Sequence, residues 1–106
     1  MEHIAILSIK RKLLGKILSG EKTIESRWYK TKKTPFNSIK ENDIIFFKET
    51  GMPITAKAIV EQALFFDNLD EEKIKEILNE HGKNIGVDMS YFEEVKDKKL
   101  CSLIFI

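Results

Sequence analysis

The chain has 106 residues, of which 42% are hydrophobic and 33% charged, a composition typical of one compact soluble domain and unlike that of a disordered segment. Its longest apolar runs fall far short of the ~20 residues that a membrane span needs, so we expect no membrane association. The single cysteine, Cys101, cannot form an internal disulfide, and the N-terminus lacks the pattern of a secretory signal. These features favour a cytoplasmic protein.

The net charge of +1 hides an uneven distribution. Residues 1–40 contain ten basic and three acidic side chains, whereas residues 41–106 contain eight basic and fourteen acidic ones. If the basic side chains also lie close together in space, they create a local field that attracts anions.

Four elements are predicted in the basic part of the chain. The apolar stretch 3–9 predicts a first strand, and residues 11–19 follow helical spacing, with leucine and isoleucine side chains on one face. Gly20 occupies the position at which helices often end in a left-handed turn. A second strand is expected over 22–28, followed by a lysine-rich surface loop over 29–42.

The middle of the chain favours β-structure. Residues 43–49 predict a hydrophobic strand, and a turn containing Gly51 follows it. Residues 54–66 predict a long strand or a strand pair, and the loss of strict alternation indicates a bend or a bulge.

The last third begins with a predicted helix over 68–81. Asn68 and Glu71 fit a capping box, and Gly82 is expected to end the helix. Two elements follow: a helical turn over 88–95 and a core strand over 99–106. The order predicts a single α+β domain spanning 1–106, built as a small mixed β-barrel with helices packed outside.

Candidate functional residues concentrate in the second strand. The stretch GEKTIESRWYK, residues 20–30, places Lys22, Glu25 and Arg27 close together. On a strand, Thr23 would share a face with Glu25 and Arg27, because side chains alternate. A solvated strand face with a surface ion pair worth ~0–1 kcal/mol is the alternative interpretation.

Two stretches resemble a known family. The pattern ILSGEKTIESRW, followed by PFNSIKENDIIFFKETGMPITAKAIV, is similar to the ASCH domain family of the PUA-like superfamily. The resemblance implies a PUA-like β-barrel with flanking helices, a cleft beside the first helix, and binding of RNA or of a nucleoside or nucleotide. It also implies that Glu25 and Arg27 line the cleft, with Lys22 at its rim.

The chemistry of these residues fits a polar planar ligand. A guanidinium donates two parallel hydrogen bonds to a phosphate or a base edge, and a carboxylate accepts from an exocyclic amine. Tyr29 is a candidate for stacking on a base, and Lys48 either marks the water boundary or reaches the cleft mouth. The resemblance also implies that Lys10, which follows the first strand, lies near the same cleft, where the family often has a lysine. The expected ligand-binding set is Lys10, Lys22, Thr23, Glu25, Arg27, Tyr29 and Lys48.

An enzymatic alternative comes from the same resemblance. Some bacterial relatives of this size are amidohydrolases that remove the acetyl group of acetylcytidine with a lysine, a threonine and a glutamate. Lys22 matches the lysine and Glu80 is placed like the glutamate, but Glu25 occupies the threonine position. The resemblance therefore favours a binding module, with a hydrolase of modified nucleosides or RNA as the alternative. Neither a cofactor nor a metal is expected, because His3 and His81 are isolated.

Overall fold

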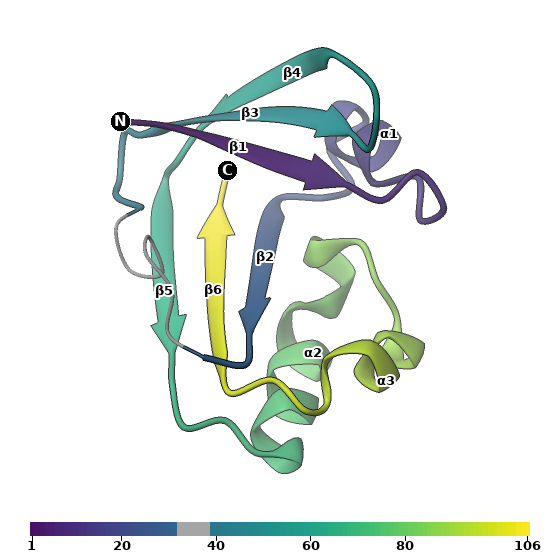
Figure 1. The fold of residues 1–106 in the computed structure, drawn as a ribbon, viewed down its shortest axis with the longest axis vertical. Coiled ribbons are helices and arrows are strands. Elements are labelled where there is room, and N and C mark those ends of the chain that lie inside the picture. The colour runs from purple at the N-terminus through teal and green to yellow at the C-terminus, as the bar shows by residue number, and fades with distance from the viewer. Residues whose placement is uncertain (32–38) are drawn as a thin grey trace.

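The computed structural model describes residues 1–31 and 39–106, so residues 32–38 of the basic loop predicted over 29–42 lie outside the described residues. The strands form two three-stranded sheets (Figure 1). The first sheet has the order β1-β3-β4 and contains Glu2–Leu7, Ile44–Glu49 and Ile54–Ile59. The second has the order β2-β6-β5 and contains Ile24–Tyr29, Leu100–Phe105 and Gln62–Phe66.

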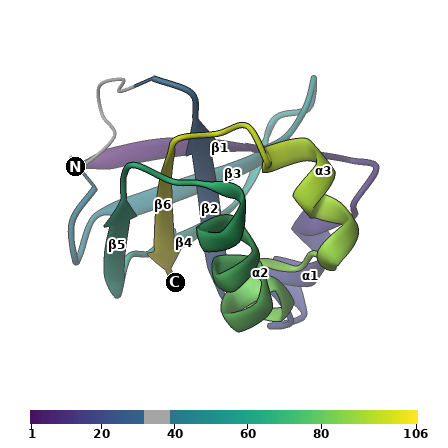
Figure 2. The same ribbon diagram turned by 90° about the horizontal axis from the view of Figure 1, so that it is seen from below.

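The helix Glu71–Ile85 and the helical turns that follow it cover one side of the second sheet (Figure 2), whereas the short helix Leu13–Leu18 packs against side chains of the first sheet. The long helix α2 packs against the second sheet, and α1 and α3 lie on the same side of the molecule in both views. The helical elements are α1 (Leu13–Leu18), α2 (Glu71–Ile85), the 3-10 turn η1 (Met89–Tyr91) and α3 (Phe92–Val95). The last two confirm the helical turn predicted over 88–95.

The α+β class is confirmed, but the strands do not close into the expected barrel. The bend predicted over 54–66 is present, and it carries the chain from one sheet to the other. Val60 N donates to Asp43 O at 2.8 Å in the first sheet, and Glu61 N donates to Phe105 O at 2.7 Å in the second. Two adjacent residues thus pair with different sheets, which makes a corner between β4 and β5 instead of a continuous barrel wall.

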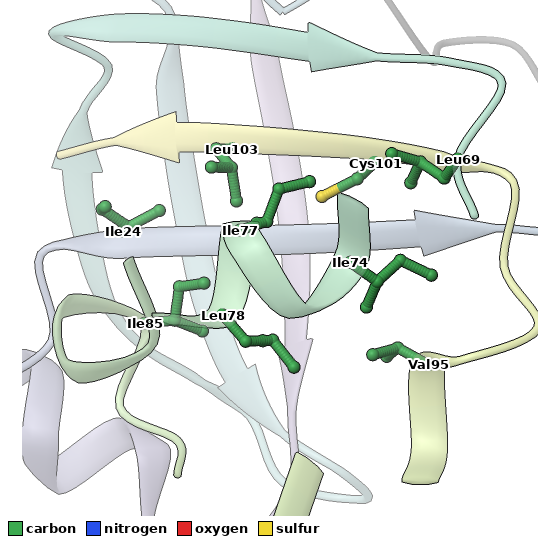
Figure 3. Close-up of a cluster of buried hydrophobic side chains, with 9 residues drawn as sticks. All are labelled: Ile24, Leu69, Ile74, Ile77, Leu78, Ile85, Val95, Cys101 and Leu103. Carbon is green, nitrogen blue, oxygen red and sulfur yellow. The ribbon is translucent and has the colours of Figure 1, made fainter. Parts of the chain in front are cut away.

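Two hydrophobic clusters form the core, and β6 contributes to both. Leu103 faces the cluster between the second sheet and α2, which Figure 3 shows. Its neighbour Ile104 faces the cluster between the two sheets, together with Ile45 and Phe47. Because successive side chains of a strand point to opposite faces, a central strand that is buried on both sides reads as a continuous apolar run.

The predicted limits of α2 were wrong at both ends. Asp70, and not Asn68, caps the helix, and its carboxylate accepts from Lys73 N at 2.8 Å. Gly82 lies inside the helix, where a Cβ would come within 3.3 Å of Val87 O, so this glycine serves a close approach of the backbone. The helix ends at Gly86, which has a φ of 91°.

The short helix α1 begins later than expected. Lys12 precedes it with a left-handed backbone, at a φ of 55°, so regular helical structure starts at Leu13. Gly20 has a φ of 82°, as expected for the residue that follows a helix end. The loop between β1 and α1 therefore carries Lys10 and Arg11 outside regular structure.

Two glycines make a matched pair for testing the role of the turn after α2. Gly86→Ala is expected to lower the free energy of unfolding by ~1–2 kcal/mol, because a left-handed backbone disfavours a Cβ. The added Cβ would also lie 3.2 Å from Lys16 Cδ and 3.4 Å from Leu13 Cδ2. Gly15→Ala meets nothing within 4 Å and should raise the free energy of unfolding by up to ~1 kcal/mol. Urea denaturation measures both, and equal effects would contradict this account.

Candidate functional site

A cavity of about 220 Å³ opens where β1 ends, β2 begins and α2 meets the residues of η1 and α3. It lies at the junction of both sheets with the helical side of the molecule and not on the face of a single strand. Its polar lining includes Lys10, Arg11, Lys22, Glu25, Tyr91 and Glu94.

Lys22 is buried in the wall of this cavity, with 2% of its surface exposed, and does not lie at the predicted rim. Its Nζ donates to the carbonyl oxygens of Ile24 and Ile85, each at 2.6 Å, and lies 3.3 Å from Glu25 Oε1. An ammonium group has three N–H donors, and these three acceptors occupy all of them. Lys22 therefore joins the start of β2 to the end of α2 and has no donor left for a ligand.

Glu25 is the buried carboxyl group of the site, with 7% of its surface exposed. Burial raises the pKa of its carboxyl group, while the charges of Lys22 and Arg27 and the N–H of Ser26 act in the opposite direction. Burial likewise lowers the pKa of the Lys22 ammonium, against the attraction of Glu25. A carboxylate has about four acceptor positions, so Glu25 keeps capacity to accept a hydrogen bond from a molecule in the cavity.

An aromatic and ionic group missed by the sequence analysis completes the cavity. Arg11 Nη2 lies 2.7 Å from Glu94 Oε1, and its guanidinium carbon lies 4.8 Å from the centre of the Tyr91 ring. Tyr91 meets Trp28 edge to face, with 6.5 Å between ring centres. Burial raises the pKa of Tyr91 to about 12, so its phenol stays neutral at physiological pH. The only sequence signal for Tyr91 was an aromatic residue in a short polar helical turn.

The cavity brings together three of the predicted ligand-binding residues, which are Lys10, Lys22 and Glu25. Arg27 is directed elsewhere, because its Nη2 donates to the carbonyl oxygen of Ile4 at 3.2 Å and so links β2 to the edge strand β1 of the other sheet. The remaining predicted site residues also do not line the cavity: Thr23, Tyr29, Lys48 and Glu80.

Metal and membrane features are not found in the described ranges. Residues 1–31 and 39–106 hold no group of three or more histidine, cysteine, aspartate or glutamate side chains that could bind a metal ion. Within the same ranges, no helix combines the length and the apolar character required to cross a membrane.

The buried ion pair can be tested by removing one partner and then both. Lys22→Met is expected to lower the free energy of unfolding by ~3–5 kcal/mol, because it leaves the Glu25 carboxylate buried without its counter-ion. Lys22→Met combined with Glu25→Gln should recover part of this loss. The control Lys73→Met removes an exposed lysine 3.8 Å from Glu76 and should cost less than ~1 kcal/mol. Urea denaturation of the four proteins decides, and a Lys22→Met loss no larger than that of the control would refute a structural role.

Comparison with known proteins gives a fold but no close relative. No protein-family model matches the sequence, and no curated protein does so either. The structure of ASCH from Zymomonas mobilis is similar at a TM-score of 0.66 and 16% identity, over 96% of this chain and 65% of that chain, so this chain spans just under two thirds of its length. The structure of a hypothetical protein is similar at a TM-score of 0.63 and 24% identity, over 99% of this chain and 96% of that one. The chain therefore has the fold of the ASCH domain.

Proposed function

We propose that the cavity binds a nucleobase that carries an exocyclic amino group, in RNA or in a modified nucleoside. The observation that carries this proposal is the buried carboxylate of Glu25, which lines the cavity beside a counter-ion whose donors are all engaged. The expectation of RNA or nucleotide binding for an ASCH fold supports it.

The size of the cavity agrees with a small planar ligand. At about 220 Å³ it is smaller than the ~300–1,000 Å³ typical of sites for drug-sized ligands, which suits one base better than an entire nucleotide. Tyr91 offers an aromatic ring in the lining, and because Arg11 lies over one face of this ring, a base would stack on the other face. Stacking on an aromatic side chain contributes ~1–3 kcal/mol per base in single-strand binders.

The carboxylate sets the expected base preference. Cytosine presents an amino group at N4 and adenine one at N6, and an ionised carboxylate can accept from either. Uracil presents a carbonyl oxygen at the equivalent position, which would face the lone pairs of Glu25 without a hydrogen. Cytosine and adenine are therefore preferred over uracil.

A hydrolase is the second candidate, because burial raises the pKa of Glu25, a property typical of general acid–base residues. In this reaction, Glu25 would accept a proton from water that attacks the acyl carbon of an acylated base amine. The carbon–nitrogen bond then breaks, the carboxylic acid leaves and the base amine takes up the proton. The engaged donors of Lys22 would hold Glu25 in position.

The binding proposal is tested with fluorescently labelled oligocytidylate and oligouridylate of equal length. The wild type should bind oligocytidylate at least ~10-fold more tightly in fluorescence polarisation, since a correct base contact contributes ~1–3 kcal/mol of discrimination. Glu25→Gln should lose most of the preference, because an amide presents one oxygen and one NH₂ group, while Glu72→Gln, on the exposed surface of α2, should retain it. Equal binding of the two strands, or none, would refute the proposal, and a urea transition for each variant verifies folding.

The hydrolase candidate has its own readout. Incubation with N4-acetylcytidine should release cytidine, detected by chromatography, and Glu25→Gln should abolish the release while Glu72→Gln leaves it intact. If the protein binds oligocytidylate but releases no cytidine from N4-acetylcytidine, the binding proposal is supported and the hydrolase candidate is refuted.

A further inference from the structure

A second hollow adjoins the cavity that contains Glu25 and differs from that cavity in charge. It has a volume of about 570 Å³, and four basic side chains line it: Lys10, Arg11, Lys16 and Lys83. Lys10, Arg11 and Val87 line both spaces, so the two are neighbours on either side of these residues. The hollow is the place at which part of the basic N-terminal third of the chain gathers in space.

Most of these cations have no anionic partner among the described residues. Across residues 1–31 and 39–106, Arg11 pairs with Glu94, but Lys10, Lys16 and Lys83 form no ion pair. Elsewhere in these ranges, Lys30 pairs with Asp97, Lys73 with Glu76 and Lys96 with Glu93, whereas other lysines such as Lys48, Lys57 and Lys99 form no ion pair either. The hollow is therefore distinguished by the four basic side chains that line one space.

Two acidic residues also line the hollow, and they do not balance its charge. The Asp88 carboxylate accepts from the backbone N–H and the hydroxyl of Ser90, so it caps the turn η1. Glu21 is exposed and, within the described ranges, takes part in no ion pair. Because Arg11 is already paired with Glu94, the three lysines face two carboxylates, which leaves an excess of one positive charge.

The end of α2 explains only part of this excess. Lys16 Nζ donates to Gly86 O at 2.8 Å, and Lys83 lies in the last turn of α2, where a helix carries about half a negative charge. This interaction uses one of the three donors of Lys16. Lys10 and Arg11 belong to a different segment and, within the described ranges, form no hydrogen bond or ion pair with the end of α2.

We infer that this hollow is a phosphate subsite, and that the ligand is a phosphorylated nucleoside or an RNA strand instead of a free nucleoside. The inference rests on the proposed function, because the base in the adjoining cavity would position the phosphate. Arg11 offers a planar fork that can bind two phosphate oxygens, and the lysines act as mobile point charges. A terminal phosphate and an internal phosphodiester share this chemistry.

The test compares cytidine, cytidine 5′-monophosphate and unphosphorylated oligocytidylate by isothermal titration calorimetry. The monophosphate should bind about 10-fold more tightly than cytidine, which corresponds to ~1.4 kcal/mol, because its phosphate gains charge-assisted hydrogen bonds. Lys16→Gln/Lys83→Gln changes two side chains that line only the hollow, and should reduce this advantage to about threefold. The control Lys57→Gln/Lys73→Gln removes the same charge from other surfaces and should preserve the advantage.

The oligonucleotide separates the two sources of phosphate. An advantage of the monophosphate that depends on Lys16 and Lys83 supports a subsite for a terminal phosphate. Equal binding of cytidine and its monophosphate, with oligocytidylate weakened about threefold by the double variant, supports a subsite for an internal phosphodiester. If Lys16→Gln/Lys83→Gln weakens binding of the monophosphate and of oligocytidylate no more than the control variant does, the phosphate subsite is refuted while base binding stands. If none of the three ligands binds, both proposals fail.

Discussion

The ammonium group of Lys22 is the interaction on which the site depends. A buried charge is tolerated only when it is paired and hydrogen-bonded, and Lys22 meets this requirement with two carbonyl oxygens and the Glu25 carboxylate. Those carbonyls belong to Ile24, at the start of β2, and to Ile85, at the end of α2. One side chain thereby sets the distance between the strand and the helix between which the cavity opens.

The packing around this point leaves little freedom. The carbonyl oxygen of Gly86 accepts from Lys16 in α1, so the residue that ends α2 is held from a second direction. A Cβ on Gly86 would lie within 3.6 Å of Lys22 Cβ and closer still to Lys16 and Leu13. The helix end, α1 and the buried lysine thus meet around one glycine. A glycine with a left-handed backbone allows this approach, since no Cβ has to be accommodated.

The sequence predicted the elements and the α+β class well, because hydrophobic periodicity reports on which residues are buried. It also singled out Lys22 and Glu25. The barrel was a poorer prediction, since closure depends on which strands pair across the corner at Val60 and Glu61, and no local pattern encodes that choice. Tyr91 and Arg11 were missed for a similar reason. They lie eighty residues apart, and they meet only because η1 packs near the loop after β1.

The placement of Lys22 and Arg27 illustrates the limit of strand alternation as a guide to a site. Alternation assigns side chains to faces only inside a strand, but Lys22 precedes β2, so the turn before the strand determines its direction. The backbone N–H of Lys22 donates to Lys16 O at 2.9 Å, and that of Thr23 donates to Asn84 O at 2.8 Å. These bonds draw the turn onto the helices and bury the lysine. Arg27 lies within β2, where its guanidinium reaches the carbonyl oxygen of Ile4, on an edge strand whose outer backbone groups have no neighbouring strand in the sheet. The guanidinium group of Arg27 could bind a ligand, but here it donates a hydrogen bond to a backbone carbonyl oxygen, because the edge of the first sheet lies within reach of the second.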